Sequence, residues 1–277
     1  MIPPTISDLI ARAAAHPFLS EHLAMGQGVH SEIALARFDG MELASAYEPI
    51  FDISVHALAQ SLSSGAEGVD RFGDELGFQA VTHQLGSAPF EVFDPFDRIG
   101  EDQELVALDR MSRALHAINF FGAQRHGLLF LRVHERLLKS VKYDHGRHFS
   151  TVLLSFGLNP SRVVIELPAA AVAHKTFLGY LTKSYQHYGF KVAGNLSNAG
   201  QILSVSETAR LDFIKMDAAV ALRESMVKPL VGYASRLSIP LIFNRVMDEP
   251  QFVALQQYDV RFVQGPLFNA HYHDRAV

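Results

Sequence analysis

The sequence contains no cysteine, which excludes disulfide bonds and thiolate metal sites. No apolar run approaches the roughly 20 residues that a membrane-spanning helix needs. The first residues also lack the basic stretch and apolar segment of a signal peptide. A net charge of -5 at pH 7 gives no electrostatic reason to expect nucleic acid or an anionic membrane as a partner. We therefore expect a cytoplasmic protein with neither kind of partner.

Two common functional motifs are also missing. No Gly-rich turn follows the first predicted strands, so a nucleotide-binding doubly wound sheet has no support. No G-x-S-x-G elbow marks a Ser-His-Asp hydrolase. No proline- or serine-rich linker divides the 277 residues, of which 48% are apolar and 19% charged. This composition is typical of a globular chain with a sizeable core.

Short apolar runs alternate with helix-sized amphipathic segments along most of the chain. The predicted strands are residues 46–53, 77–83, 128–134, 162–168, 190–194, 212–216, 239–244 and 260–265. Several of them are apolar nearly throughout, as expected for parallel strands that are buried on both faces. The alternation favours the α/β class, and an eight-stranded TIM-type barrel is the simplest closed form.

Polar residues stand at the ends of most of these predicted strands. In chain order they are His83, Arg132, Glu166, Asn195, Lys215, Asn244 and Gln264. In a barrel of this type the chemistry lies at the C-terminal ends of the strands. Any one of these residues alone is more simply explained as a strand-end group bonded to a loop. The whole series predicts a polar barrel mouth, although a polar mouth need not be an active one.

Four segments carry a resemblance to a known family. They are "AYEPIFDI" (46–53), "GLNPSRVVIELP" (157–168), "LDFIKMD" (211–217) and "VRFVQGPLFNAH" (260–271). In this order they resemble segments of the EAL-domain cyclic di-GMP phosphodiesterases, and the resemblance extends over residues 44–270. It implies a modified TIM-type (β/α)8 barrel of the EAL kind in residues 44–277. The preceding residues 1–43 are expected to form a helical segment that packs on the barrel.

The resemblance also implies a reaction with two divalent cations, which activate a water and stabilise the attacked phosphodiester. Most matching positions are altered. The glutamate that names the family falls at Gln79, an asparagine ligand at Arg132, one of two paired aspartates at Asn195 and a late glutamate at Asn244, whereas Glu166, Lys215, Asp217 and Gln264 match. Magnesium and manganese need hard oxygen ligands, chiefly carboxylates. We therefore expect no bound metal, no cofactor and no catalytic residue.

Without a metal, Glu166 and Lys215 most simply neutralise each other, so we expect an ion pair between them, with Arg132 as a further candidate member. If the mouth binds a nucleotide, its phosphates would meet cationic side chains, since arginine suits bidentate phosphate contacts. The candidate ligand-binding residues are Glu48, His83, Arg132, Lys215 and Gln264.

Three functional interpretations follow, and the sequence leaves all three open. The favoured one is a catalytically inactive EAL-like domain that acts as a regulatory module in bacterial signalling by binding a protein partner. A homodimer is compatible with it. The first alternative is a cyclic di-GMP receptor that binds without hydrolysis, and the second is a weak metal-dependent phosphodiesterase, for which magnesium or manganese would be the cofactor.

New binding surface is expected in the N-terminal segment or in the insertion at residues 54–76. In the N-terminal segment, apolar residues keep helical spacing up to a break at Pro17, namely Leu9, Ile10, Ala13, Ala14, Phe18 and Leu19. The simplest reading is that this stripe packs on the barrel.

Two histidine clusters invite a search for a zinc site. They are Asp144, His145 and His148, and His271, His273 and Asp274. Neither cluster falls at a predicted strand end, so we interpret both as solvated polar residues.

Overall fold

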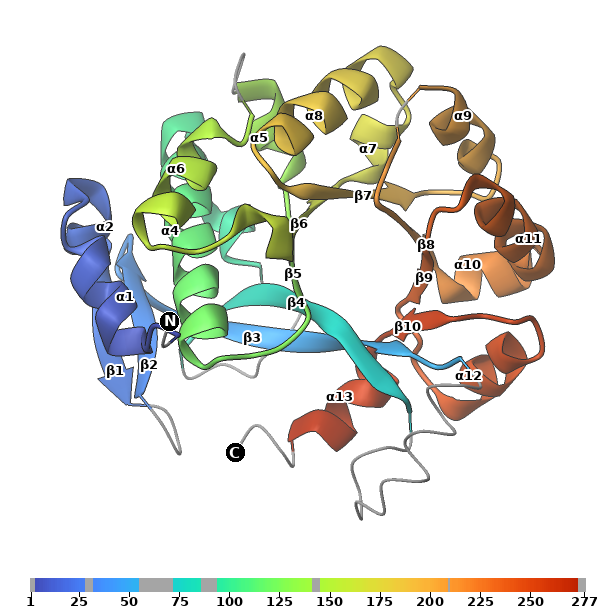
Figure 1. Ribbon diagram of the computed structural model, residues 1–277, viewed down its shortest axis with the longest axis horizontal. Coiled ribbons are helices and arrows are strands. Elements are labelled where there is room, and N and C mark those ends of the chain that lie inside the picture. Colours follow the sequence, from blue (N-terminus) through green and yellow to red (C-terminus); the bar gives the residue numbers. More distant parts are fainter. Residues whose placement is uncertain are drawn as a thin grey trace.

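A computed structural model describes residues 3–27, 32–54, 72–85, 94–140, 145–208 and 210–273 (Figure 1). Its ten-stranded sheet closes through a pairing between β3 and β4, which makes a barrel of eight strands. These are β3 (Met41–Asp52), β4 (Asp74–Gln84), β5 (Leu128–Arg132), β6 (Val163–Leu167), β7 (Lys191–Leu196), β8 (Phe213–Asp217), β9 (Leu241–Asn244) and β10 (Phe262–Gln264). The expected α/β barrel is confirmed, and all eight predicted strands are present.

Strand β3 departs from a regular TIM barrel because it runs antiparallel to both of its neighbours, β4 and β10. The strands from β4 to β10 are parallel to one another. The long β3–β4 pair forms one wall of the ring in Figure 1. Its register pairs Glu48 with Gln79, so two of the candidate site residues lie side by side.

Helices surround the barrel on the outside, as Figure 1 shows. They are α4 (Asp102–Gly122), α5 (Glu135–Ser140), α6 (Arg147–Ser155), α7 (Ala169–Val172), α8 (Lys175–His187), α9 (Gln201–Thr208), α10 (Ala218–Arg223), α11 (Val227–Leu237), α12 (Glu249–Gln256) and α13 (Pro266–His273), with short 3-10 turns η1 (Pro95–Arg98) and η2 (Pro160–Arg162). Within the described ranges, no helix is long and apolar enough to cross a membrane.

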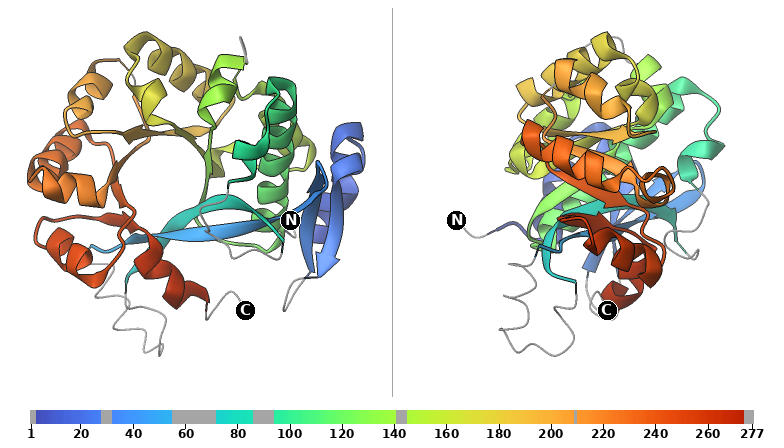
Figure 2. Two further views of the ribbon diagram at one scale, coloured as in Figure 1. Left: turned by 180° about the vertical axis from the view of Figure 1, so that it is seen from behind. Right: turned by 90° about the vertical axis from the view of Figure 1, so that its right-hand side faces the viewer.

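The N-terminal segment is only partly helical, which corrects the expectation for residues 1–43. Helices α1 (Ile6–Ala13) and α2 (Pro17–His22) are followed by strands β1 (Leu23–Gln27) and β2 (Glu32–Phe38). The break at Pro17 is confirmed, because Pro17 opens α2 after α1 has ended. This layer extends the sheet through the β2–β3 pairing and lies outside the ring (Figure 2). Strand β3 begins at Met41 and runs across the expected boundary between residues 43 and 44.

The apolar stripe of the N-terminal helices faces the rest of the protein. Leu9, Ala13 and Leu19 are buried in the main core, and Ile10 and Phe18 pack against it. Ala14, which keeps the same spacing, is exposed. The packing interpretation of the stripe is therefore confirmed for five of its six residues.

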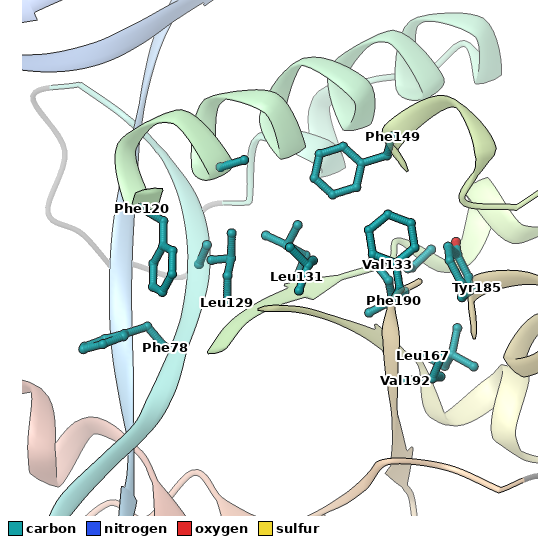
Figure 3. Packing of buried hydrophobic residues seen from close by; sticks show 14 of the residues in the cluster. Phe78, Phe120, Leu129, Leu131, Val133, Phe149, Leu167, Tyr185, Phe190 and Val192 are labelled. Atoms are coloured by element: carbon teal, nitrogen blue, oxygen red, sulfur yellow. The ribbon is translucent and has the colours of Figure 1, made fainter. Parts of the chain in front are cut away.

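Two apolar cores stabilise the barrel. The larger fills the space between strands and helices, where Phe149 of α6 stacks on Phe190 at 5.6 Å between ring centres (Figure 3). The smaller contains one residue from each of seven strands, namely Ile50, Phe130, Val164, Ala193, Phe213, Ile242 and Phe262. This second set forms an apolar layer within the barrel. The polar residues at the strand ends begin beyond this layer.

Candidate site at the barrel mouth

Along each strand, the polar residues of the mouth lie two positions from a residue of the apolar layer. Side chains two residues apart on a strand point to the same face. Arg132, Glu166, Asn195, Lys215, Asn244 and Gln264 each follow a residue of the apolar layer by two positions. Glu48 precedes Ile50 by two positions and reaches the same end, because β3 runs in the opposite direction. The period of the strands thus carries all of these side chains to the mouth.

Lys215 lies at the centre of this polar layer. Its Nζ is 2.5 Å from Glu166 Oε1 and 2.7 Å from Gln79 Oε1. The Lys215 side chain is 0% exposed and that of Glu166 is 1% exposed. The expected ion pair between Lys215 and Glu166 is therefore confirmed. Gln79, which the resemblance aligns with the family-naming glutamate, accepts a hydrogen bond from the ammonium group.

The network continues from Gln79 to the other side of the barrel. Gln264 Nε2 donates to Gln79 Oε1 at 3.0 Å and also to Glu48 Oε2. The second oxygen of Glu48 accepts from Asn269 Nδ2 at 3.2 Å. Burial raises the pKa of Glu48, while Lys215 and the two amide donors act in the opposite direction. Together with Glu166, the side chains of Lys215, Gln79, Gln264, Glu48 and Asn269 thus form one hydrogen-bonded polar assembly.

Asn269 was not predicted from the sequence. It lies on α13, after the short strand that carries Gln264, and it is 9% exposed. Asn269 belongs to the segment "VRFVQGPLFNAH", but nothing in the sequence spacing shows that α13 folds back onto Glu48 of the first barrel strand.

The remaining site residues line a cavity of about 250 Å³ at the mouth. Its lining includes Arg132, Asn195, Asp217, Asn244 and Arg245, together with Lys215 and Glu166. Arg132 is exposed and, among the described residues, its side chain has no hydrogen bond or ion pair, so it does not join the Lys215–Glu166 pair. Asn195 Nδ2 donates to the carbonyl of Leu167 at 3.0 Å.

Asp217 is already engaged by two groups of the protein. One of its carboxylate oxygens caps α10 by accepting from the backbone N–H of Val220 at 3.0 Å. The other lies 3.4 Å from Arg245 Nη1. Arg245 directly follows Asn244 in the sequence, and its pairing with Asp217 was not predicted.

The two cations that the resemblance implies do not fit these residues. An ammonium nitrogen lies between Glu166 and Gln79, where a metal ion would need their oxygens. Of the two carboxylates lining the cavity, Glu166 is paired with Lys215 and Asp217 with Arg245. A dication about 4 Å from a guanidinium would be repelled by roughly 8 kcal/mol at an effective dielectric near 20. Nor do the described ranges contain any group of three His, Cys, Asp or Glu residues that could hold a metal.

A second cavity, of about 200 Å³, lies beside the mouth between α4 and the ends of β4 and β5. It shares Arg132, Val133 and Pro168 with the first cavity. Its polar lining includes the buried ion pair of Asp109 and Arg113, with 2.7 Å between Oδ2 and Nε. Nothing in the sequence predicts this cavity, because its α4 residues have the pattern of the polar positions of an amphipathic helix.

Three other predicted residues have simpler surroundings. His83 is half-buried, burial lowers its pKa, and it lines neither cavity. His145 is buried with its ring against Tyr180 and Tyr185, so it is a core residue and not the solvated one that we expected. His148 is exposed.

Several other expectations concern positions outside the described residues. They include Asp144, Asp274 and residues 55–71 of the expected insertion. The side chains of His271 and His273 also lie outside them.

The structure resembles solved structures of other proteins. It is similar to a standalone EAL protein of Vibrio cholerae O395 in its c-di-GMP-bound form, with a TM-score of 0.63 and 17% identity over 83% of this chain and 91% of that one. It is also similar to Klebsiella pneumoniae BlrP1 in complex with manganese and cyclic di-GMP, with a TM-score of 0.64 and 18% identity over 94% and 64% of the two chains. This chain has the EAL-domain fold.

A third similar structure is Bacillus subtilis YkuI, which has an EAL domain and was solved with c-di-GMP and calcium. Its TM-score is 0.60, with 20% identity over 80% of this chain and 54% of that one. No protein-family model and no curated protein matches the sequence. At these identities the EAL likeness establishes the fold alone.

Proposed function

We propose that this chain is a non-hydrolysing EAL-fold protein that acts as a regulatory binding module in bacterial signalling. The observation that carries the proposal is the position of Lys215, whose Nζ contacts Glu166 and Gln79 at 2.5 and 2.7 Å. Metal-assisted phosphodiester hydrolysis needs cations that activate a water and neutralise developing charge. Here a protein ammonium group occupies the place between the two oxygens, and it cannot supply a bound hydroxide.

We infer that the principal partner is a protein, bound through the N-terminal layer. Strand β1 ends the ten-stranded sheet, and in the described ranges only β2 pairs with it. Its sequence, "LAMGQ", contains no charged residue and no proline, and Met25 is 39% exposed. Natural edge strands are normally protected by charges, proline or bulges, because an open edge pairs with extended segments.

A second copy of this chain is the partner that suits this edge best. An antiparallel pair centred on Met25 would place Leu23 opposite Gln27 and Ala24 opposite Gly26. No like charges would oppose each other, and one strand would serve both subunits of a two-fold dimer.

A cyclic di-GMP receptor is the second candidate function, and the two adjoining cavities favour it. They measure about 250 and 200 Å³ and share Arg132, which is exposed between them. The structures of the similar Vibrio cholerae, Klebsiella pneumoniae and Bacillus subtilis proteins contain this dinucleotide. A receptor of this kind would bind the intact nucleotide and change its contacts with other proteins.

A calorimetric titration with cyclic di-GMP, with and without magnesium, tests these proposals when a product assay follows on the same samples. We expect no hydrolysis product under either condition. Linear product formation that requires magnesium or manganese would overturn the proposed function. Micromolar binding of intact nucleotide would establish the receptor, and an absence of heat would leave the protein-binding module.

A further inference from the structure

The cavity of about 200 Å³ beside α4 lies on the helix side of the barrel wall. Neighbouring side chains of a strand point to opposite faces. Gln79 points into the barrel, so Ala80 points outward, and Ala80 and Leu131 belong to the core between strands and helices. Figure 3 shows Leu131 between β5 and α4. The cavity therefore extends under α4, and it meets the mouth at a rim formed by Arg132, Val133 and Pro168.

One face of α4 carries four polar side chains along this cavity. Asp109, Ser112, Arg113 and His116 are spaced i, i+3, i+4 and i+7, which places them on the same side of the helix. Asp109 pairs with Arg113, and His116 bonds two hydroxyl groups of the neighbouring strands. The stripe that a helix buries against a sheet is normally apolar. Packing alone therefore does not explain this face, and the Ser112 hydroxyl is its one member left without a partner in the described ranges.

The Ser112 hydroxyl is buried at the wall of the cavity. The residue is 3% exposed, and its Oγ makes no hydrogen bond within the part of the chain that is described. The large majority of buried polar groups in proteins are hydrogen-bonded, and an unsatisfied one destabilises the fold. Because Ser112 lines the cavity, a molecule inside it can complete this bond. A serine hydroxyl both donates and accepts, so a hydroxyl group on the ligand is a suitable partner.

The charges and the volume of the cavity restrict the ligand further. Three carboxylates, of Asp94, Asp109 and Glu135, face two guanidinium groups, of Arg113 and Arg132, which gives a net charge of -1 with the histidines neutral. The lining therefore does not favour an anion. A dry apolar cavity of about 150 Å³ is large enough to bind benzene. The volume of about 200 Å³ accommodates one six-membered ring with a small substituent.

Aromatic and aliphatic side chains form the rest of the wall. The rings of Phe96 and His134 stack with 5.8 Å between their centres, at an angle of 10° between the ring planes. The apolar lining residues besides Phe96 are Ala80, Val81, Leu131, Val133 and Pro168. An apolar ring buries its surface favourably against such side chains, and aromatic rings prefer to stack or to meet edge to face.

We propose that this cavity binds an uncharged aromatic compound of a single ring with one hydroxyl group, which bonds Ser112 Oγ. The ring packs between the apolar residues of β4 and β5 and the Phe96–His134 pair. The inference is independent of the proposed function, because it requires neither a metal nor a nucleotide at the mouth. It assigns the smaller cavity to a ligand other than cyclic di-GMP.

Fluorine NMR of the full chain with 4-fluorophenol tests the proposal. We expect saturable binding of one molecule per chain, and weaker binding of 4-fluorobenzoate because the lining has no surplus of positive charge. Ser112→Ala should reduce the affinity for 4-fluorophenol about fivefold, which corresponds to one neutral hydrogen bond. The same variant should bind fluorobenzene, which lacks the hydroxyl, as tightly as the unmodified chain does.

Ser150→Ala is the matched control. Ser150 is a buried serine of α6 that lines neither cavity, and its hydroxyl donates to the carbonyl of Tyr188 at 3.1 Å. This variant should bind 4-fluorophenol with unchanged affinity. An equal loss in Ser150→Ala, or no loss in Ser112→Ala, would overturn the proposal.

Three further outcomes would also overturn it. Absence of saturable binding would mean that the cavity holds only water. Tighter binding of 4-fluorobenzoate would show that the site prefers an anion. Displacement of 4-fluorophenol by cyclic di-GMP would make the cavity part of a nucleotide site. None of these results depends on hydrolysis, so the product assay with cyclic di-GMP decides the proposed function separately.

Discussion

Lys215 Nζ and Glu166 Oε1 lie 2.5 Å apart, although their strands, β8 and β6, are separated by β7. The contact therefore crosses the barrel interior instead of joining adjacent strands. The same nitrogen bonds Gln79 on β4, so one ammonium group connects three sides of the mouth. This arrangement explains how a buried carboxylate is tolerated in a mouth without a cation, since buried charges persist in proteins only when they are paired and hydrogen-bonded.

The variant Lys215→Met tests the structural weight of this pair. It leaves Glu166 buried without its cation, and breaking a buried pair costs about 3–5 kcal/mol. We expect a loss of that size in the free energy of unfolding, measured by urea titration at pH 7. The double variant Lys215→Met with Glu166→Leu should lose less than the single variant, because it leaves no unpaired charge. A single variant that is as stable as the unmodified chain would contradict the buried pair.

Restoring acidic positions should recover cation binding without recovering turnover. In the triple variant Gln79→Glu, Arg132→Asn, Asn195→Asp, the mouth gains two carboxylates and loses a guanidinium, which favours a hard dication. We expect manganese binding by calorimetry in this variant but no product from cyclic di-GMP, because Asn244 and Arg245 are unchanged. Unchanged metal affinity would show that these strand ends do not form one site.

In the described ranges only β2 pairs with β1, so a second copy at its other edge can be tested by chemical crosslinking. The chain has no native cysteine that would form a competing disulfide. We expect Met25→Cys to form a disulfide-linked dimer under mild oxidation. Directly opposed residues of antiparallel strands lie about 4.5–5.5 Å apart at Cα, within the range for a disulfide. Met247→Cys is the control, since Met247 is exposed but lies outside the edge strand. Equal crosslinking of both variants, or a purely monomeric chain in sedimentation, would exclude this dimer.

The barrel strands were predictable because buried parallel strands appear in sequence as short apolar runs. Strands β1 and β2 were missed for two physical reasons. "LAMGQ" directly continues the helical pattern of α2, and in "EIALARF" the apolar run is only four residues long (33–36) and alternates between half-buried and buried residues. A hairpin outside the barrel is covered on one face only, and that produces the alternation.

The inner residues of the site were predictable for a related reason. Strand period and strand ends are local properties, so Glu166, Lys215 and Gln264 could be assigned to the mouth from the sequence alone. The contacts of Asn269 with Glu48 and of Arg245 with Asp217 depend on how α13 and the turn after β9 return to the barrel. No spacing in the sequence contains that information.

His116, in the middle of α4, should make stability depend on pH. Its ring bonds the hydroxyls of Ser45 and Thr82, and burial, with smaller contributions from His83 and Arg113, lowers its pKa to about 3. In the unfolded chain a histidine has a pKa near 6.5, so between these values only the unfolded state takes up the proton. Stability contributed by the neutral ring is complete above about pH 6.5 and falls as the pH decreases toward 3.

Urea unfolding of the unmodified chain and of His116→Gln at pH 7.5 and 5.5 measures this contribution. Between these two pH values we expect the unmodified chain to lose about 1.4 kcal/mol more than the variant. The other thirteen histidines are common to both proteins and cancel in the comparison. Equal pH dependence in the two proteins would mean that the His116 ring takes up its proton in the folded state, which burial of the ring opposes.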